Sequence, residues 1–142
     1  MIDFNFEDVN FQLPEQHTLV DWISFAVKNE GYELKNITYV FCSDEYLWNM
    51  NKQFLQHDYY TDIITFDYVK GKVVSGDLFI SYDRIVDNAN KFDVSRETEL
   101  LRVMIHGVLH LIGYDDVTDE LEAEIHKMED YYLDIYDKEF RR

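Results

Sequence analysis

The 142-residue chain has few of the residues that cross-link or interrupt a fold: it holds one cysteine, one proline and five glycines. A single cysteine, Cys42, excludes an internal disulfide, and so little proline and glycine leaves little room for linkers between domains. No apolar run is long enough to span a membrane, and the N-terminus has neither the basic start nor the apolar stretch of a secretory signal. These absences predict one cytoplasmic domain over residues 1–142, without membrane contact.

Positive charge is also scarce, because 13 lysines and arginines face 29 aspartates and glutamates, for a formal net charge of −16. A surface of that charge repels phosphate groups and argues against a protein that binds free nucleic acid through general electrostatic attraction. A nucleic-acid substrate would need a local positive rim or a partner that delivers it. The basic residues in segments that could form such a rim are Lys52, Lys70, Lys72, Lys91, Arg96 and Arg102.

Four segments have the patterns of β-strands. Residues 2–6 alternate apolar and polar side chains, which predicts a strand with one buried face. Residues 37–42 are β-branched or aromatic with apolar side chains on both faces, which is typical of a central strand. Residues 63–69 and 76–81 are joined across a turn at Gly71 and predict a hairpin.

Five segments have the patterns of helices. The first is expected to be capped by Thr18, with Asp21 in the capping-box position, and to end before Gly31. The second begins at Ser43 with two acidic residues, and three further helices are expected at 83–92, 95–112 and 118–140. Four strands and about five helices predict an α/β fold built on a small mixed sheet.

The helix expected at 95–112 is apolar almost all round, except along one narrow strip. His106 and His110 lie on that strip together with Glu99 and Arg102. A helix of this kind belongs in the interior of the fold. Because buried imidazoles need partners, the strip is expected to face a cleft, solvent or a bound ion.

The residues after the two histidines complete a metal-site pattern, H-x3-H-x2-G-x2-D. Gly113 can take the left-handed conformation that ends a helix, so the chain can turn back and present Asp116 beside His106 and His110. Two imidazoles and one carboxylate form a common three-ligand catalytic zinc set with a fourth position open for water. Asp115 is the rival third ligand, and histidines that merely bond to the backbone or to carboxylates are the alternative to a metal site.

The spacing also matches the zinc site of the metzincin proteases, with one difference. These proteases have a glutamate directly after the first histidine, and here Gly107 stands in its place. A peptide-cleaving reaction would therefore lack its usual proton acceptor.

With the segment "HGVLHLIGYDD" in view, the chain resembles the YbeY family of bacterial endoribonucleases, whose signature is H-G-x-L-H-L-x-G-Y-D-H. Two more family segments are similar to "MNKQFLQHDYYTDIITFDY" and "GDLFIS". The resemblance implies a single αβα domain with a zinc site at His106, His110 and Asp116, at the end of a central helix. It also implies a role in ribosomal RNA processing and in maturation of the small ribosomal subunit.

Two departures from the family pattern stand out. Asp116 replaces the third histidine of the signature, and Leu55 replaces an arginine suited to binding substrate phosphate. Asp62 and Thr65 match family positions close to the metal cleft, and with Arg102 they are the candidates for substrate contact.

The resulting prediction is a metal-dependent endoribonuclease that hydrolyses RNA phosphodiesters with one Zn²⁺ or another divalent metal per chain, and without an assigned general base. Its expected partners are RNA, above all ribosomal RNA, and the ribosome or small-subunit proteins. The alternatives are a metzincin-like metalloprotease and a non-catalytic ribosome-assembly module stabilised by a metal.

Overall fold

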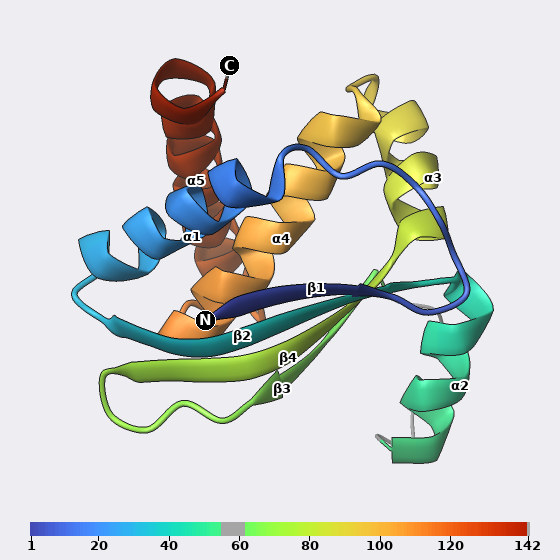
Figure 1. Cartoon of the computed structure of the whole chain (residues 1–142), viewed down its shortest axis with the longest axis horizontal. Coiled ribbons are helices and arrows are strands. Elements are labelled where there is room, and N and C mark those ends of the chain that lie inside the picture. Colours follow the sequence, from blue (N-terminus) through green and yellow to red (C-terminus); the bar gives the residue numbers. More distant parts are fainter. Residues whose placement is uncertain (55–61, 142) are drawn as a thin grey trace.

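The computed structural model describes residues 1–54 and 62–141 (Figure 1). These residues form four β-strands, five α-helices and a C-terminal π-helical turn. In chain order they are β1 (Ile2–Phe6), α1 (Gln16–Asn29), β2 (Glu33–Cys42), α2 (Asp44–Phe54), β3 (Ile63–Asp67), β4 (Val73–Ser81), α3 (Tyr82–Phe92), α4 (Arg96–Ile112), α5 (Asp119–Ile135) and the π-turn Tyr136–Phe140. The predicted α/β class and mixed four-stranded sheet are confirmed.

The four strands form one sheet in the order β1-β2-β4-β3. Strands β1, β2 and β4 are parallel, and β3 runs antiparallel to β4 at the edge, as the hairpin prediction required. A parallel centre needs cover on both faces. Helices α1 and α4 pack against one face, with α5 behind them, and α2 packs against β3 and β4 from the other (Figure 1).

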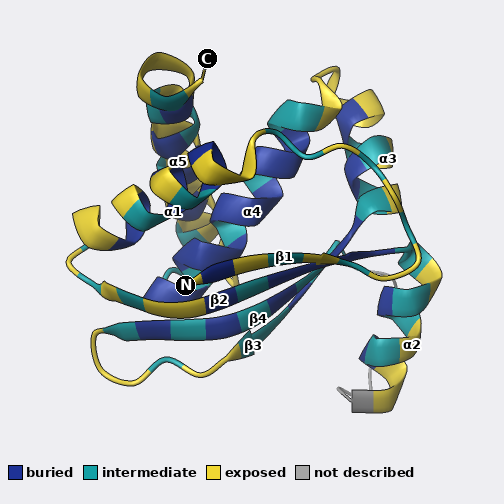
Figure 2. Ribbon diagram, in the orientation of Figure 1, coloured by how far each residue is buried: buried dark blue, intermediate teal, exposed yellow. Residues whose placement is uncertain are grey.

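Helix α4 is buried within the layer that α1, α4 and α5 form on one face of the sheet. Eleven of its 17 residues are buried, and the helix is dark along most of its length in Figure 2. It contacts β3, β4, α1, α3 and α5. Ser95 caps its start by accepting the backbone N–H of Thr98, and Gly113 ends it with a φ of 118°. The apolar pattern of the sequence predicted this burial, Gly113 predicted the end, and the start lies one residue after the predicted Ser95.

The first helix begins earlier than predicted. Helix α1 starts at Gln16, so Thr18 lies in its first turn and does not cap it. The Glu15 carbonyl accepts the first helical hydrogen bond from Leu19, while the Thr18 hydroxyl donates to the Glu15 side chain. Asp21 is not a capping-box residue but faces His17, with 3.4 Å between Oδ2 and Nε2.

Four further boundaries differ from the prediction. Strand β3 ends at Asp67, because its carboxylate accepts the N–H of Val69 and turns the chain. Strands β2 and β4 extend back to Glu33 and Val73, which pair with each other across the parallel ladder. The last helix changes to a π-turn at Tyr136. Within residues 1–54 and 62–141, no helix is both long and apolar enough to cross a membrane.

Gly76 of β4 allows both the paired strand β3 and helix α4 to approach closely. A Cβ atom there would lie 2.8 Å from the Phe66 carbonyl oxygen and 2.9 Å from Cδ2 of Leu111. We expect Gly76→Ala to lower the free energy of unfolding by roughly 1–3 kcal/mol, because a backbone oxygen of the paired strand cannot move aside. Urea denaturation measures the change. Ser75→Ala, on the opposite face of the strand, should stay within about 0.5 kcal/mol of the parent, and equal stability of the two variants would contradict the packing argument.

Candidate metal centre

Two imidazoles face the same space from consecutive turns of α4. His106 and His110 are four residues apart, their ring centroids lie 4.5 Å apart, and their side chains are 19% and 25% exposed. Helical spacing places residues i and i+4 on the same face, so the backbone alone brings these rings together. Their partial exposure shows that the pair opens towards solvent at one side.

The bend after α4 brings a carboxylate to the two rings. Gly113 takes the left-handed conformation, and its N–H bonds back to the Leu109 and His110 carbonyls. Beyond it, Oδ2 of Asp116 lies 3.7 Å from Nε2 of His106 and 3.5 Å from Nε2 of His110. The three side chains each offer a ligand atom, and these atoms lie within 4.8 Å of one another.

These spacings fit a metal ion. Ligand atoms at about 2.0–2.2 Å from a tetrahedral zinc lie roughly 3.4 Å from one another, so the 3.5 and 3.7 Å separations need little adjustment. The charge of the set also fits. The two imidazoles are neutral, and the one carboxylate carries a negative charge that a divalent cation offsets. His106, His110 and Asp116 are therefore the residues of this centre that could hold a metal ion.

Asp115, the rival ligand in the sequence, is used differently. Its Oδ1 accepts the backbone N–H of Asp116 at 2.7 Å, which stiffens the bend. Its side chain lines a separate hollow beside Glu30 and Tyr32 and is not part of the three-residue group. The geometry thus favours Asp116 over Asp115.

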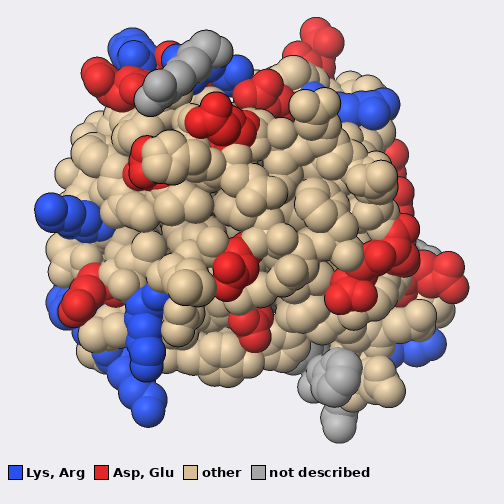
Figure 3. Space-filling model, viewed as in Figure 1, with Lys and Arg blue, Asp and Glu red and all other residues tan. Residues whose placement is uncertain are grey.

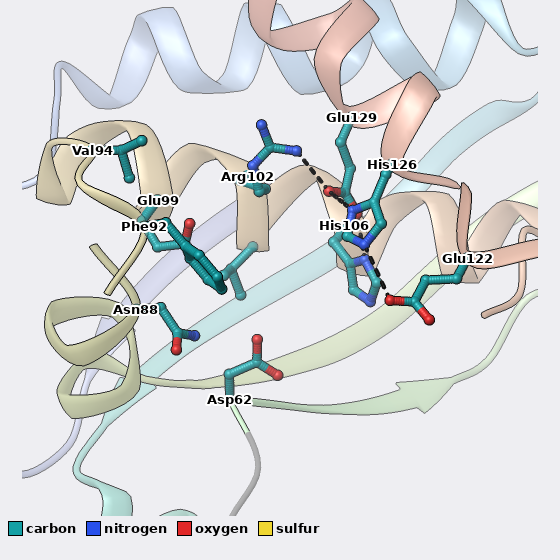
Figure 4. Close-up of a pocket in the computed structure, with 11 residues that line it drawn as sticks. Asp62, Asn88, Phe92, Val94, Glu99, Arg102, His106, Glu122, His126 and Glu129 are labelled. Atoms are coloured by element: carbon teal, nitrogen blue, oxygen red, sulfur yellow. Dashed lines mark hydrogen bonds and ion pairs between the residues drawn. The ribbon is translucent and has the colours of Figure 1, made fainter. Parts of the chain in front are cut away.

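A buried glutamate supports the site, and sequence reasoning did not identify it. Glu129 of α5 is 1% exposed, and its Oε2 lies 2.6 Å from Nδ1 of His106. Its other oxygen accepts from Nη1 of Arg102 and faces Nδ1 of His126, each at 3.0 Å (Figure 4). The available signal was periodicity, because Glu129 falls on the apolar stripe of α5 between Ile125 and Tyr132.

These contacts set the protonation of the pair. Burial alone would raise the pKa of Glu129, but hydrogen bonds from His106, His126 and Arg102 lower it below its ordinary value. An ionised carboxylate only accepts, so Nδ1 of His106 carries the proton and Nε2 is left facing Asp116. A carboxylate behind a ligating histidine is the usual second partner in metal sites and raises the basicity of the ligand.

Of the three other predicted site residues, two line a cavity beside this centre and one does not. Asp62 and Arg102 line a cavity that also contains His106, whereas Thr65 lies on β3 opposite Leu78 and is not among the described residues of the cavity wall. Burial raises the pKa of Asp62 despite the nearby His106. Leu55, where the family arginine is replaced, lies outside the described residues.

Basic side chains do not gather at the centre. Arg102 is the only lysine or arginine among the described residues that line the cavity, and it is bonded to Glu129 and to Asp130. On the face drawn in Figure 3, blue side chains lie along the edges, several of them together at the lower left, and the middle of the face carries none. The positive rim considered from the sequence is thus reduced, at the cavity wall, to one arginine that is already paired.

Position 107 points away from the centre. A Cβ atom on Gly107 would lie 2.9 Å from Cδ1 of Ile63 and 3.0 Å from Cδ1 of Leu78, so this side of α4 faces the sheet. A glutamate at position 107 would have no room in this packing.

The fold and the site together define an α/β protein whose candidate metal centre is built from one buried helix and the bend that follows it. Comparison with known proteins makes the assignment more specific. The family model described as Endoribonuclease YbeY matches residues 2–137. The chain belongs to the YbeY family.

Individual relatives agree with this assignment. The chain is 43% identical over 136 residues to the Endoribonuclease YbeY of Flavobacterium psychrophilum, covering 96% of both chains. It is 47% identical over 131 residues to that of Cytophaga hutchinsonii, covering 91% of both. A solution structure of a protein from Thermotoga maritima superimposes with a TM-score of 0.68 at 26% identity, covering 97% of this chain and 91% of the other.

The Glu129 contact makes a prediction for the metal-free protein. Burial lowers the pKa of His106, but Glu129, Asp62 and Asp116 outweigh it and raise this pKa above 6.5. Protonated His106 therefore adds stability below pH 6.5, and that stability is lost as pH rises through the folded-state pKa. We expect Glu129→Gln to lower the pKa of His106, as measured by NMR titration of the imidazole.

The matched control is Asp130→Asn, which removes the exposed partner of Arg102 but leaves the Glu129–His106 contact. It should leave the His106 titration close to that of the parent. An unchanged His106 pKa in a folded Glu129→Gln variant would show that this contact does not control the ring.

Proposed function

We propose that this protein is a metal-dependent endoribonuclease, with residues 1–142 forming one YbeY-like metal-binding domain. The single observation that carries the proposal is the convergence of His106, His110 and Asp116 in a chain that matches the YbeY family over residues 2–137. Its relatives are named endoribonucleases, and RNA is accordingly the proposed substrate.

The residues of the centre have separate tasks in this proposal. His106, His110 and Asp116 would hold one divalent ion, with Zn²⁺ the best match to two imidazoles and a carboxylate. When bound, such an ion polarises a phosphoryl oxygen and lowers the pKa of a water molecule. Glu129 keeps Nε2 of His106 free of its proton and pointed at the site, and Arg102 in turn holds the Glu129 carboxylate.

Cleavage of RNA is favoured over cleavage of peptides by the packing of α4. Metzincin proteases use a glutamate directly after the first histidine as their proton acceptor, and here that position is a glycine packed on Ile63 and Leu78. Cleavage of RNA can use the ribose 2′-hydroxyl as the nucleophile. The metalloprotease alternative therefore lacks both the family relationship and the residue that it needs.

We further propose that the substrate is ribosomal RNA, that the protein acts in maturation of the small ribosomal subunit, and that it does so in the cytoplasm. The family segments in the sequence support this assignment. The net charge of −16 also supports this assignment, because it should weaken the binding of free RNA. An assembling ribosomal particle can hold the RNA in place instead.

The choice of third ligand can be tested by metal binding. We expect Asp116→Ala to lose more zinc affinity than the roughly 10–100-fold that removal of an outer partner costs, because a direct ligand is removed. Asp115→Ala should keep the parent affinity, since Asp115 bonds only to the backbone of the bend. Competition with a chromophoric chelator measures both. A folded Asp115→Ala variant that alone loses zinc would reverse the assignment.

The catalytic role of the metal can be separated from a structural one. The purified protein should cleave a structured ribosomal RNA fragment, lose this activity to a chelator and regain it with Zn²⁺, while a peptide library stays intact. His110→Ala should be inactive yet folded, because its side chain is partly exposed and α4 is held by its apolar faces. Circular dichroism checks the fold. An unfolded His110→Ala protein would favour the metal-stabilised assembly module, and cleaved peptides would favour the protease.

A further inference from the structure

A cavity of about 570 Å³ opens beside His106, away from Asp116. Its walls come from α3, α4, α5 and from Asp62, just before β3 (Figure 4). This volume falls within the range of pockets that bind small molecules and cofactors. The His-His-Asp group itself uses only one of the residues that line it, so the rest of the wall is available to a ligand.

Glu99 is the residue of this wall whose buried carboxylate the metal centre does not explain. It is 5% exposed, and among the residues that the structure describes its carboxylate makes no hydrogen bond or ion pair. No fully buried side-chain oxygen in the described chain lacks a partner, so the Glu99 oxygens must reach the cavity surface. Burial raises the pKa of Glu99 to about 6, which leaves most of it ionised at pH 7. A buried carboxylate in this state calls for hydrogen-bond donors from a ligand or from water.

The charges around Glu99 select the kind of ligand. Asp62, Glu122 and Glu129 also line the cavity, and Arg102, the single cation among its described lysines and arginines, is bonded to Glu129 and Asp130. A phosphate group would meet several carboxylates, and the one arginine among the described residues of the wall is already paired. A neutral group that donates hydrogen bonds avoids that repulsion.

The rim of the cavity adds an apolar, flat surface. Phe92 is 58% exposed and Val94 is 40% exposed, and both line the cavity between α3 and α4. An aromatic ring with this exposure offers a stacking surface to a nucleobase. Asn88, on the same wall, adds an amide that both donates and accepts.

We propose that this cavity binds a guanine base of the RNA strand, next to the phosphodiester held at the histidines. The Glu99 carboxylate accepts hydrogen bonds from the N1–H and the 2-amino group of guanine, which are adjacent donors matched to its two oxygens. Phe92 covers the face of the base. Glu99 precedes His106 by seven residues on one face of α4, about 10 Å along the helix axis, so a neighbouring nucleotide can place its base there.

This inference rests on the proposed function, but its test does not require cleavage. Guanosine is added to the ¹⁵N-labelled protein, and inosine, which lacks only the 2-amino group, is the matched ligand. We expect guanosine to shift amide signals around Glu99, Asn88 and Phe92, and inosine to bind about 3–10-fold more weakly, the effect of one lost hydrogen bond. Inorganic phosphate should cause no shift at these residues.

The variant Glu99→Gln keeps the size of the side chain and removes its charge. It should weaken guanosine binding about tenfold, because charge-assisted hydrogen bonds are the stronger kind. Glu120→Gln, on the exposed first turn of α5, is the charge-matched control and should bind as the parent does.

Several results would overturn the inference. They are the absence of guanosine shifts at the cavity, equal binding of guanosine and inosine, parent-like binding by Glu99→Gln, or occupation of the cavity by Mg²⁺ in place of the nucleoside. Failure of the proposed function would look different, since guanosine would still bind to a protein that cleaves no RNA. Conversely, RNA cleavage without guanosine binding would leave the proposed function intact and remove only this inference.

Discussion

The burial of α4 is the constraint on which the site depends. A helix enclosed by the sheet, α1, α3 and α5 can carry polar side chains only along a line where the packing leaves a gap. His106, His110, Arg102 and Glu99 occupy that line. Because the helix cannot rotate without burying these groups and exposing its apolar faces, the direction of the two imidazoles is held by hydrophobic packing across the whole helix.

Helix α5 packs beside the polar strip of α4 and contributes the carboxylate of Glu129, which faces the basic side chains of that strip. A carboxylate that is 1% exposed is costly unless hydrogen bonds satisfy it, and Glu129 faces donors on Arg102, His106 and His126. The same contacts connect α4 to α5 and hold the ring of His106. One buried acid therefore serves both the packing of two helices and the orientation of a candidate ligand.

The excess of acidic residues is consistent with the cavity beside His106. Four carboxylates line the cavity, where they favour hydrogen-bond donors over free phosphate. An RNA strand would be held by its contacts with the metal and by its bases, with less help from general attraction to the backbone. Such a protein would act on RNA that is already presented in the right place, which fits the proposed role on an assembling ribosomal subunit.

The features that could be predicted from the sequence are those that depend on residues close together in the chain. The strands, α4 and its glycine end were predictable because local periodicity and turn chemistry produce them, and the spacing of His106, His110 and Asp116 lies within a single helix and its bend. The start of α1 was mispredicted at Thr18, since the local sequence places a helix boundary only to within one or two residues.

Contacts between distant segments were beyond sequence reasoning. Glu129 is 23 residues from His106, and only the docking of α5 on α4 joins them. The same docking, with α3 and Asp62, forms the cavity that Glu99 lines. The sequence by itself determined which groups share one face of one helix, because a helix repeats every 3.6 residues. Only the tertiary structure decided which of those groups gained partners from other elements, because burial and charge pairing depend on how the elements pack together.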